Sequence, residues 1–210
     1  MREELLPLFP LPLVLFPRTP LPLHIFEERY KEMIGQAIED GSEFGIVMAR
    51  NNGVVNAGCS ANVLEVAHRY SDGRLDIVTR GQRRFELLEL VDGQNYLRGR
   101  VRYFDDEEFS PVEEDLRRRA LEGYAQAVQA TGQDAETKPL LEDPQLSFQL
   151  AQILSDVDMR QQLLMMRSET ERLKQLLQYF PQHVKRFQHT ELIREVAPKN
   201  GHGKHLPFGN

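Results

Sequence analysis

The prolines near the N-terminus constrain this chain more than any other feature of its sequence. Six of the 12 prolines lie within the first 22 residues, where they interrupt an apolar stretch that begins at Leu5. A proline lacks the backbone N–H that a continuous helix needs, and it pushes the residue before it toward extended geometry. Prolines are tolerated at the start, the edge or a bulge of a β-strand. We therefore expect this opening to form interrupted strands laid across a core.

The same stretch could suggest a signal peptide or a membrane anchor, but its residues favour neither. Glu3 and Glu4 outweigh Arg2, and no Ala-x-Ala cleavage site follows. The prolines block a helix, and the apolar run is shorter than the roughly 20 residues that span a bilayer. We expect no membrane partner.

Composition and charge indicate a globular protein of the cytoplasm. The chain has 210 residues, enough for one or two domains with a substantial core. Its formal charge of -6 argues against general nucleic-acid binding, which usually needs a basic face. The single cysteine, Cys59, cannot form an internal disulfide, which is consistent with a reducing compartment.

Alternating hydrophobicity and turn residues predict that residues 1–109 are mostly β-structure. One amphipathic helix is expected at Tyr30–Ile38, ended by Gly41. A hairpin is expected around the Asp-Gly turn at 71–74, and the clearest strand is Leu97–Tyr103, with its arginines on one face. The other expected strands are 44–49, 63–70, 75–80 and 85–90. Several short strands and one helix suggest a small closed or nearly closed barrel.

Residues 110–197 are expected to be helical, after an acidic linker at 105–111 that marks the boundary. A capping box, Ser168-x-x-Glu171, opens the last helix, and Pro181 is expected to kink it. The other expected helices run over 116–128, over 150–157 and over 163–166. The tail 198–210 is glycine-rich and is expected to be disordered.

Three stretches resemble the N-terminal substrate-binding domain of Lon proteases. They are Leu8-Phe9-Pro10-Leu11 with Val14-Leu15-Phe16-Pro17 and Leu21-Pro22-Leu23-His24-Ile25-Phe26-Glu27-x-Arg29-Tyr30; Asp72-Gly73-Arg74-Leu75-x-Ile77-x-Thr79-x-Gly81-x-x-Arg84-Phe85; and Gln162-Leu163-Leu164 with Glu171-Arg172-Leu173. The resemblance covers roughly residues 5–190. It implies a stand-alone member of that family with an α+β fold, a PUA-like β pseudo-barrel with a short helix, followed by a helical bundle. Arg18 stands where the family usually has glycine after Phe-Pro.

We expect no catalysis and no cofactor. The 210 residues contain no Gly-x-x-x-x-Gly-Lys-Ser/Thr motif to hold ATP phosphates. Ser168 and Lys174 are a tempting nucleophile and base, but a capping role explains Ser168. Cys59 lacks a nearby base in sequence, so packing explains it better than nucleophilic chemistry. His202 and His205 in the tail lack further ligands, so we expect no metal site.

The resemblance implies recognition of unfolded or extended polypeptides. The candidate binding residues of the opening are Phe16, Pro17, His24, Phe26 and Tyr30. The candidates of the barrel strands are Arg80, Arg83 and Arg84, which could receive acidic groups through charge-assisted hydrogen bonds. The arginines could equally form a solvated wall of the barrel. Two other functions stay open, an adaptor that docks on a protease or chaperone, and a hydrolase that uses His24 or Cys59.

Overall fold

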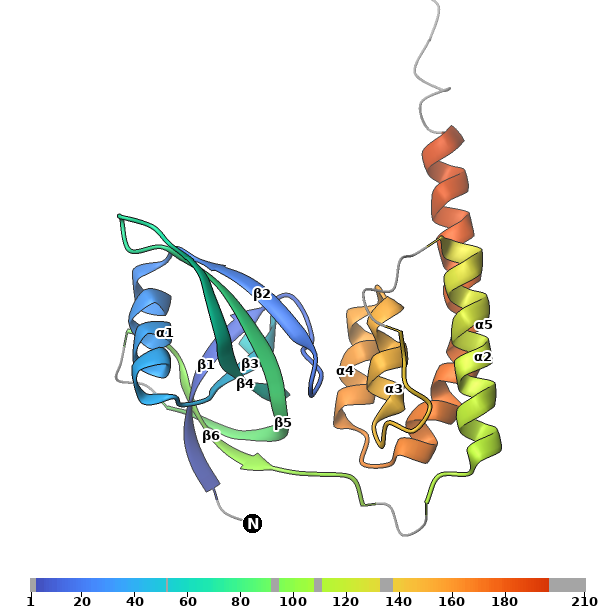
Figure 1. The fold of residues 1–210 in the computed structure, drawn as a ribbon, viewed down its shortest axis with the longest axis horizontal. Helices are drawn as coiled ribbons and strands as arrows, with labels where there is room; N and C mark the ends of the chain where they lie inside the picture. The colour runs from blue at the N-terminus through green and yellow to red at the C-terminus, as the bar shows by residue number, and fades with distance from the viewer. Residues whose placement is uncertain (1–2, 52, 92–94, 108–110, 133–137, 197–210) are drawn as a thin grey trace, which may run out of the picture. The chain divides into compact units, whose positions relative to one another are not determined.

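The computed structural model describes residues 3–51, 53–91, 95–107, 111–132 and 138–196 (Figure 1). Its elements, in chain order, are β1 (Glu3–Leu11), β2 (Pro20–Ile25), α1 (Glu28–Asp40), β3 (Phe44–Arg50), β4 (Gly53–Arg69), β5 (Leu75–Val91), β6 (Arg98–Tyr103), α2 (Glu114–Thr131), α3 (Leu146–Leu150), the 3-10 turn η1 (Ala151–Ile153), α4 (Val157–Met165) and α5 (Glu169–Val196). None of the helices in the described ranges is both long enough and apolar enough to cross a membrane.

The six strands form one sheet that closes on itself. Their order is β2-β5-β4-β3-β1-β6, and β6 pairs with β5 as well as with β1. The long strand β5 makes this closure possible, because its residues 75–80 pair with β2 while its residues 85–91 pair with β6. Strand β1 changes partner in the same way, since residues 3–7 pair with β6 and residues 8–11 pair with β3. The result is a small barrel with β2 as an added strand.

Alternation along the strands fills the barrel. Leu6, Leu8, Val47, Phe85 and Val101 form a buried cluster, and each comes from a strand whose next residue points the other way. On β6 the prediction is confirmed, because Gly99 and Val101 are buried while Arg100 is exposed. Helix α1 covers one side of the barrel (Figure 1), with Tyr30, Met33, Ile34 and Ala37 buried.

The predicted turns of the β part are confirmed, but two of its predicted strands are one. Gly41 ends α1 in the left-handed conformation at φ 61°, and Gly73 takes φ 83° in the hairpin turn. The strands expected at 75–80 and 85–90 are joined in β5. Residues 81 and 84 between them pair with β4, so the ladder continues through the stretch.

The helical half of the chain differs more from expectation. Gly132 ends α2 as predicted, at φ 63°. The helix expected over 150–157 is wrong, because η1 ends at Ile153 and α4 begins at Val157. The Asp156 carboxylate accepts a hydrogen bond from the Met159 backbone N–H at 3.0 Å, and this cap starts a new helix. Helix α5 begins directly after Ser168 and continues through Pro181 as one helix.

The chain divides into two compact units. One, the β unit, contains Met1–Pro111 and Leu154–Glu169; the other, the helical unit, contains Val112–Ile153 and Thr170–Asn210. The boundary expected near residue 110 stays a prediction; in this division the chain passes between the units three times, after Pro111, Ile153 and Glu169. Helix α4 belongs with the strands, because Gln161 on α4 donates a hydrogen bond to the backbone oxygen of Ala57 on β4 at 3.1 Å. The predicted tail, 198–210, lies outside the described residues.

The turn between β1 and β2 places an arginine where glycine is favoured. Arg18 has φ 60°, and it is the one residue other than glycine with positive φ among those described. Its backbone N–H donates to the Gly81 oxygen at 2.7 Å, and the Gly81 N–H donates to the Thr19 oxygen at 3.0 Å. These two bonds hold the turn against β5. The turn needs the left-handed conformation even though the sequence does not supply the usual residue for it.

This geometry makes a stability prediction. The Arg18→Gly variant is expected to be about 1 kcal/mol more stable than the Arg18→Ala variant. A side chain in the left-handed region costs roughly 1–2 kcal/mol, which glycine avoids, but glycine also loses more conformational entropy on folding, and this loss offsets part of the difference. Both variants remove the arginine side chain, so urea unfolding of the pair isolates the backbone effect. Equal stability of the two variants would contradict a left-handed residue 18.

Candidate functional site

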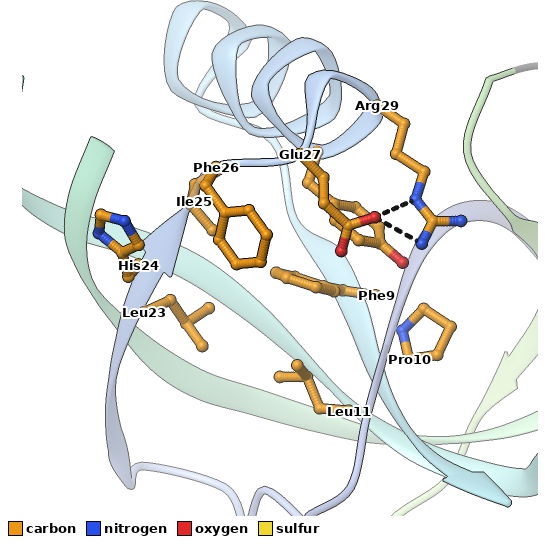
Figure 2. A pocket seen from close by; sticks show the side chains of 10 residues that line it. Phe9, Pro10, Leu11, Leu23, His24, Ile25, Phe26, Glu27 and Arg29 are labelled. Carbon is orange, nitrogen blue, oxygen red and sulfur yellow. Dashed lines mark hydrogen bonds and ion pairs between the residues drawn. The ribbon is translucent and has the colours of Figure 1, made fainter. Parts of the chain in front are cut away.

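A pocket of about 420 Å³ opens between the end of β1, the end of β2 and the start of α1. It exists because of the partner changes in the sheet. At residues 8–11 strand β1 pairs with β3, and at residues 23–25 strand β2 pairs with β5. No described pairing joins β1 to β2 directly, so side chains line the space between them. They come from Phe9, Pro10, Leu11, Leu23, His24, Ile25, Phe26, Glu27, Arg29 and Tyr30 (Figure 2).

The floor and one wall of the pocket are aromatic. The ring of Phe9 stacks on the ring of Tyr30, with centroids 4.1 Å apart and an interplanar angle of 28°. The ring of Phe26 faces Phe9 across the pocket (Figure 2) and is 60% exposed. Leu11 and Leu23 are half-buried and continue the apolar lining. An exposed phenylalanine at the mouth of an apolar hollow suits the insertion of another apolar group.

One rim of the pocket is charged and internally balanced. The guanidinium of Arg29 donates to the Glu27 carboxylate, with Nε 2.9 Å and Nη2 2.7 Å from Oε2. The same guanidinium lies 4.6 Å from the centroid of the Tyr30 ring. Burial raises the pKa of the Tyr30 hydroxyl above its usual value, so this group stays neutral at physiological pH. The rim therefore offers hydrogen bonds to a bound chain without a strong net charge.

Of the five binding residues predicted in the opening segment, three lie together in the pocket and two are buried elsewhere. His24, Phe26 and Tyr30 all line the pocket. Phe16 is fully buried, with the Arg160 guanidinium 5.1 Å from its ring centroid, and Pro17 is buried beside it. These two residues are closed to a peptide, because the turn at 16–19 presses them against β5. Their apolar character reflects the core and not a binding surface.

The three predicted arginines lie outside the pocket lining. Arg84 is 2% exposed. Its Nη1 donates to the backbone oxygens of Leu164 and Met166 at 3.1 and 2.6 Å, and its Nη2 lies 2.6 Å from Oδ1 of Asp106. Arg84 therefore fastens the segment after α4 to β5, and it is not open to a ligand.

Arg83 and Arg80 are exposed. The Arg83 guanidinium lies 3.6 Å from the Tyr103 ring centroid, and it is 4.0 Å from the Glu4 carboxylate. Arg80 stands opposite Pro20 on β2 and Asn62 on β4. Their positions fit the alternative that the sequence left open, a solvated wall of the barrel.

Sequence reasoning missed Phe9, Leu11, Leu23, Glu27 and Arg29 as pocket residues. The signal was present in part, because Phe9 and Leu11 alternate across Pro10 and so share one face of β1. The pairing of β1 and β2 with different partners, which creates the pocket, is not visible in the local sequence.

The candidates for catalysis do not assemble into a reactive group. Cys59 is fully buried, and burial raises the pKa of its thiol to about 12, so the nucleophilic thiolate is scarce. His24 Nδ1 lies 2.6 Å from Asp76, and Lys174 Nζ donates to Glu171 at 2.8 Å. Within the described ranges, no set of three His, Cys, Asp or Glu side chains could hold a metal ion. His202 and His205 lie outside those ranges.

A second, more open hollow of about 490 Å³ lies elsewhere on the β unit. Its lining residues are Pro12, Met48, Ala49, Arg50, Asn51, Val157 and Asp158. Val157 is its exposed large apolar side chain, at 37%, and Arg50 forms an ion pair with Asp158 at its rim. This second hollow has no aromatic side chain in its lining. The pocket beside Phe26 is therefore the better candidate for binding.

Comparison with known proteins agrees with this architecture. The chain is 29% identical over 112 residues to a Lon protease of Parabacteroides distasonis, a match that covers 49% of this chain and 14% of that protein. It is 26% identical over 103 residues to Lon protease 1 of Hydrogenovibrio crunogenus, which covers 45% of this chain and 12% of that protein. The chain thus spans only a small part of these relatives.

Two solved structures share the fold. The Lon N-terminal domain protein from Xanthomonas campestris superposes with a TM-score of 0.66 at 26% identity, over 84% of this chain and 98% of that one. The N-terminal domain of the Mycobacterium avium complex Lon protease gives a TM-score of 0.64 at 19% identity, over 86% and 100%. The family model for the substrate-binding domain of ATP-dependent protease La (Lon) matches residues 5–181. The chain belongs to the family of the Lon substrate-binding domain.

Proposed function

We propose that this chain is a non-catalytic polypeptide-recognition module. It binds extended, unfolded segments by taking one of their apolar side chains into the pocket between Phe9 and Phe26. The observation that carries the proposal is the exposed Phe26 ring beside the stacked pair of Phe9 and Tyr30, in a member of a family described as substrate-binding.

Energetics favour weak binding of many sequences. Burying one large apolar side chain is worth about 1.5–3 kcal/mol, and a hollow of this size receives one such group. Backbone contacts along the rim add to this, but immobilising an unfolded segment opposes it. We therefore expect dissociation constants in the micromolar range or weaker, about 8 kcal/mol or less.

We propose further that the module works in the cytoplasm, where Cys59 stays reduced, and that it passes its ligands to a protease or chaperone. The helices of the helical unit form a bundle. In support, the Tyr124 and Phe180 rings of α2 and α5 are 6.3 Å apart, and the buried Arg172 of α5 donates to Ser147 on α3 at 2.8 Å.

Replacing Phe26 with serine tests the pocket. The Phe26→Ser variant is expected to bind a phenylalanine-containing unfolded peptide about tenfold more weakly, a loss of about 1.4 kcal/mol, because the apolar wall at the mouth is lost. Binding is measured by fluorescence anisotropy with a labelled peptide.

The matched control is Leu64→Ser on β4. Leu64 is 53% exposed, close to the 60% of Phe26, and it does not line the pocket. The Leu64→Ser variant should bind the peptide as tightly as the unchanged protein does. If both variants bind as the unchanged protein does, the pocket is not the binding site. If no unfolded peptide binds the unchanged protein at millimolar concentration, the polypeptide-recognition proposal fails and the adaptor function replaces it.

A further inference from the structure

A strip of rings, three exposed and one half-buried, leads away from the pocket across the sheet. It consists of Phe26, His24, Tyr70 and His68, and we call these four residues the aromatic strip. The Phe26 and His24 ring centroids are 5.9 Å apart, those of His24 and Tyr70 are 5.9 Å apart, and those of Tyr70 and His68 are 4.4 Å apart. Phe26 and His24 also line the pocket, so a polypeptide that fills the pocket passes beside the strip.

Strand register explains why the strip forms. His24 on β2 pairs with Asp76 on β5, and Asp76 pairs with His68 on β4. The three residues therefore make one row across the outer face of the sheet, since neighbouring strands present paired residues to the same side. Tyr70 follows at the end of β4. Asp76 lies in the middle of the row and receives hydrogen bonds from both sides, from His24 Nδ1 at 2.6 Å and from the Tyr70 hydroxyl at 2.8 Å.

Asp76 places a carboxylate in the middle of the strip, and within the described ranges it pairs with His24 and with no lysine or arginine. Hydrogen bonds from His24 and from Tyr70 hold the pKa of the Asp76 carboxyl below its usual value, so the carboxylate is ionised.

Most of the other charges near the strip are paired. Glu27 pairs with Arg29, Glu28 pairs with Lys31, and Asp72 pairs with Arg74. Glu65, opposite Val78 on the same face, adds a further negative charge. Arg69 pairs with the buried Leu75, so strand alternation turns it to the opposite face from His68. Arg80 is four residues along β5 from Asp76, about 13 Å away, which exceeds the screening length of about 8–10 Å.

The strip already carries one stacked cation. The guanidinium of Arg74 lies 4.7 Å from the centroid of the Tyr70 ring, a distance at which a cation is attracted to the face of an aromatic ring. A second cation that approached from the pocket side would meet the rings of His24 and Tyr70 and the charge of Asp76 together.

Resting on the function proposed above, we propose that the aromatic strip selects polypeptide segments that carry an arginine or lysine within a few residues of the apolar anchor. The anchor enters the pocket beside Phe26, and the cationic side chain lies on the rings and approaches Asp76. Acidic residues at that place are disfavoured by Asp76 and Glu65.

Three unfolded peptides that differ at one position test this selection. Each carries a phenylalanine followed two residues later by arginine, glutamine or glutamate, and binding is measured by anisotropy. The unchanged protein is expected to bind the arginine peptide roughly three- to tenfold more tightly than the glutamine peptide, and the glutamate peptide most weakly. Added salt should reduce the difference between arginine and glutamine.

Four variants test whether the strip is the source of the preference. Asp76→Asn is expected to lose most of the preference for arginine over glutamine, while binding of both peptides remains dependent on Phe26. Glu89→Gln removes the same charge from an exposed carboxylate that pairs with Arg100, and it should keep the full preference. Tyr70→Leu should weaken the preference, whereas Tyr70→Phe, which keeps the ring, should retain most of it. Thermal unfolding of each variant shows that its fold is intact.

The outcomes separate the two proposals. If the three peptides bind the unchanged protein equally and Phe26→Ser weakens all of them, polypeptide recognition stands and the selection for cations is overturned. If the arginine preference persists undiminished in Asp76→Asn, the strip is also overturned as its source. If no peptide binds, both proposals fall.

Discussion

Replacing Arg84 with alanine is expected to lower the free energy of unfolding of the β unit by about 3–5 kcal/mol, the usual loss when one partner of a buried ion pair is removed. Three acceptors would lose their donor, the carboxylate of Asp106 and the backbone oxygens of Leu164 and Met166. The guanidinium also packs 4.7 Å from the centroid of the Phe104 ring, and this contact would become a cavity. Urea unfolding followed by circular dichroism measures the loss.

The neighbouring arginine provides the control. Arg83→Ala removes the same kind of side chain from the next residue of β5, but Arg83 is exposed and its ion pair with Glu4 is long, at 4.0 Å. Its loss should cost no more than about 1 kcal/mol, the range of exposed ion pairs and of cation–aromatic contacts. Similar losses for the two variants would show that Arg84 does not hold the segment after α4.

The second large loss of stability is expected when Gly81 is replaced with alanine. A Cβ atom at this position would lie 2.2 Å from the Phe16 backbone oxygen and 3.0 Å from the Phe16 carbonyl carbon. Backbone atoms cannot move aside as a flexible side chain can, and Gly81 also exchanges hydrogen bonds with Arg18 and Thr19. Gly81→Ala should therefore destabilise the β unit by about 3 kcal/mol, at the upper end of the cost of overpacking.

Replacing a glycine that has open space around it should instead stabilise the protein. At Gly35 in α1, a Cβ would meet nothing within 4 Å, so Gly35→Ala should raise the free energy of unfolding by up to about 1 kcal/mol through helix propensity. Thermal unfolding of the two variants under the same conditions checks both predictions. A tolerated Gly81→Ala would mean that the 16–19 turn does not lie against β5.

The elements that sequence predicted best are those fixed by local chemistry. Gly41, Gly73 and Gly132 each stop or turn the chain through a positive φ, and this requirement is visible in the residue itself. The alternation of β6 likewise needs no distant information. The separation of η1 from α4 was missed because one capping side chain, Asp156, outweighs the apolar periodicity around it.

The candidate site was less predictable because it depends on long-range pairing. Phe16 and Phe26 are both aromatic residues of the same opening segment, yet one is fully buried and the other is 60% exposed. The difference comes from the contact between residue 16 and Gly81, 65 positions later in the chain, which no local pattern contains.

The motifs that identify the family are largely structural in this chain. Gly81 and Arg84 of the second motif hold the turn and the segment after α4, and Arg172 of the third is buried under Phe148. Specific motifs of this kind identify the family more surely than they identify the binding residues. The first motif is the exception, because Phe9, Pro10, Leu11 and most residues from Leu23 to Tyr30 also line the pocket.

NMR mapping tests most directly whether polypeptides bind in the pocket beside Phe26. An unfolded polypeptide such as a reduced casein is titrated into isotope-labelled protein, and shift changes are followed residue by residue. We expect the largest changes to fall on Phe9, Leu11, Leu23, Phe26 and Tyr30, and we expect Phe26→Ser to remove them. Changes confined to the second hollow around Met48 and Val157, or to the helical unit, would contradict binding in this pocket.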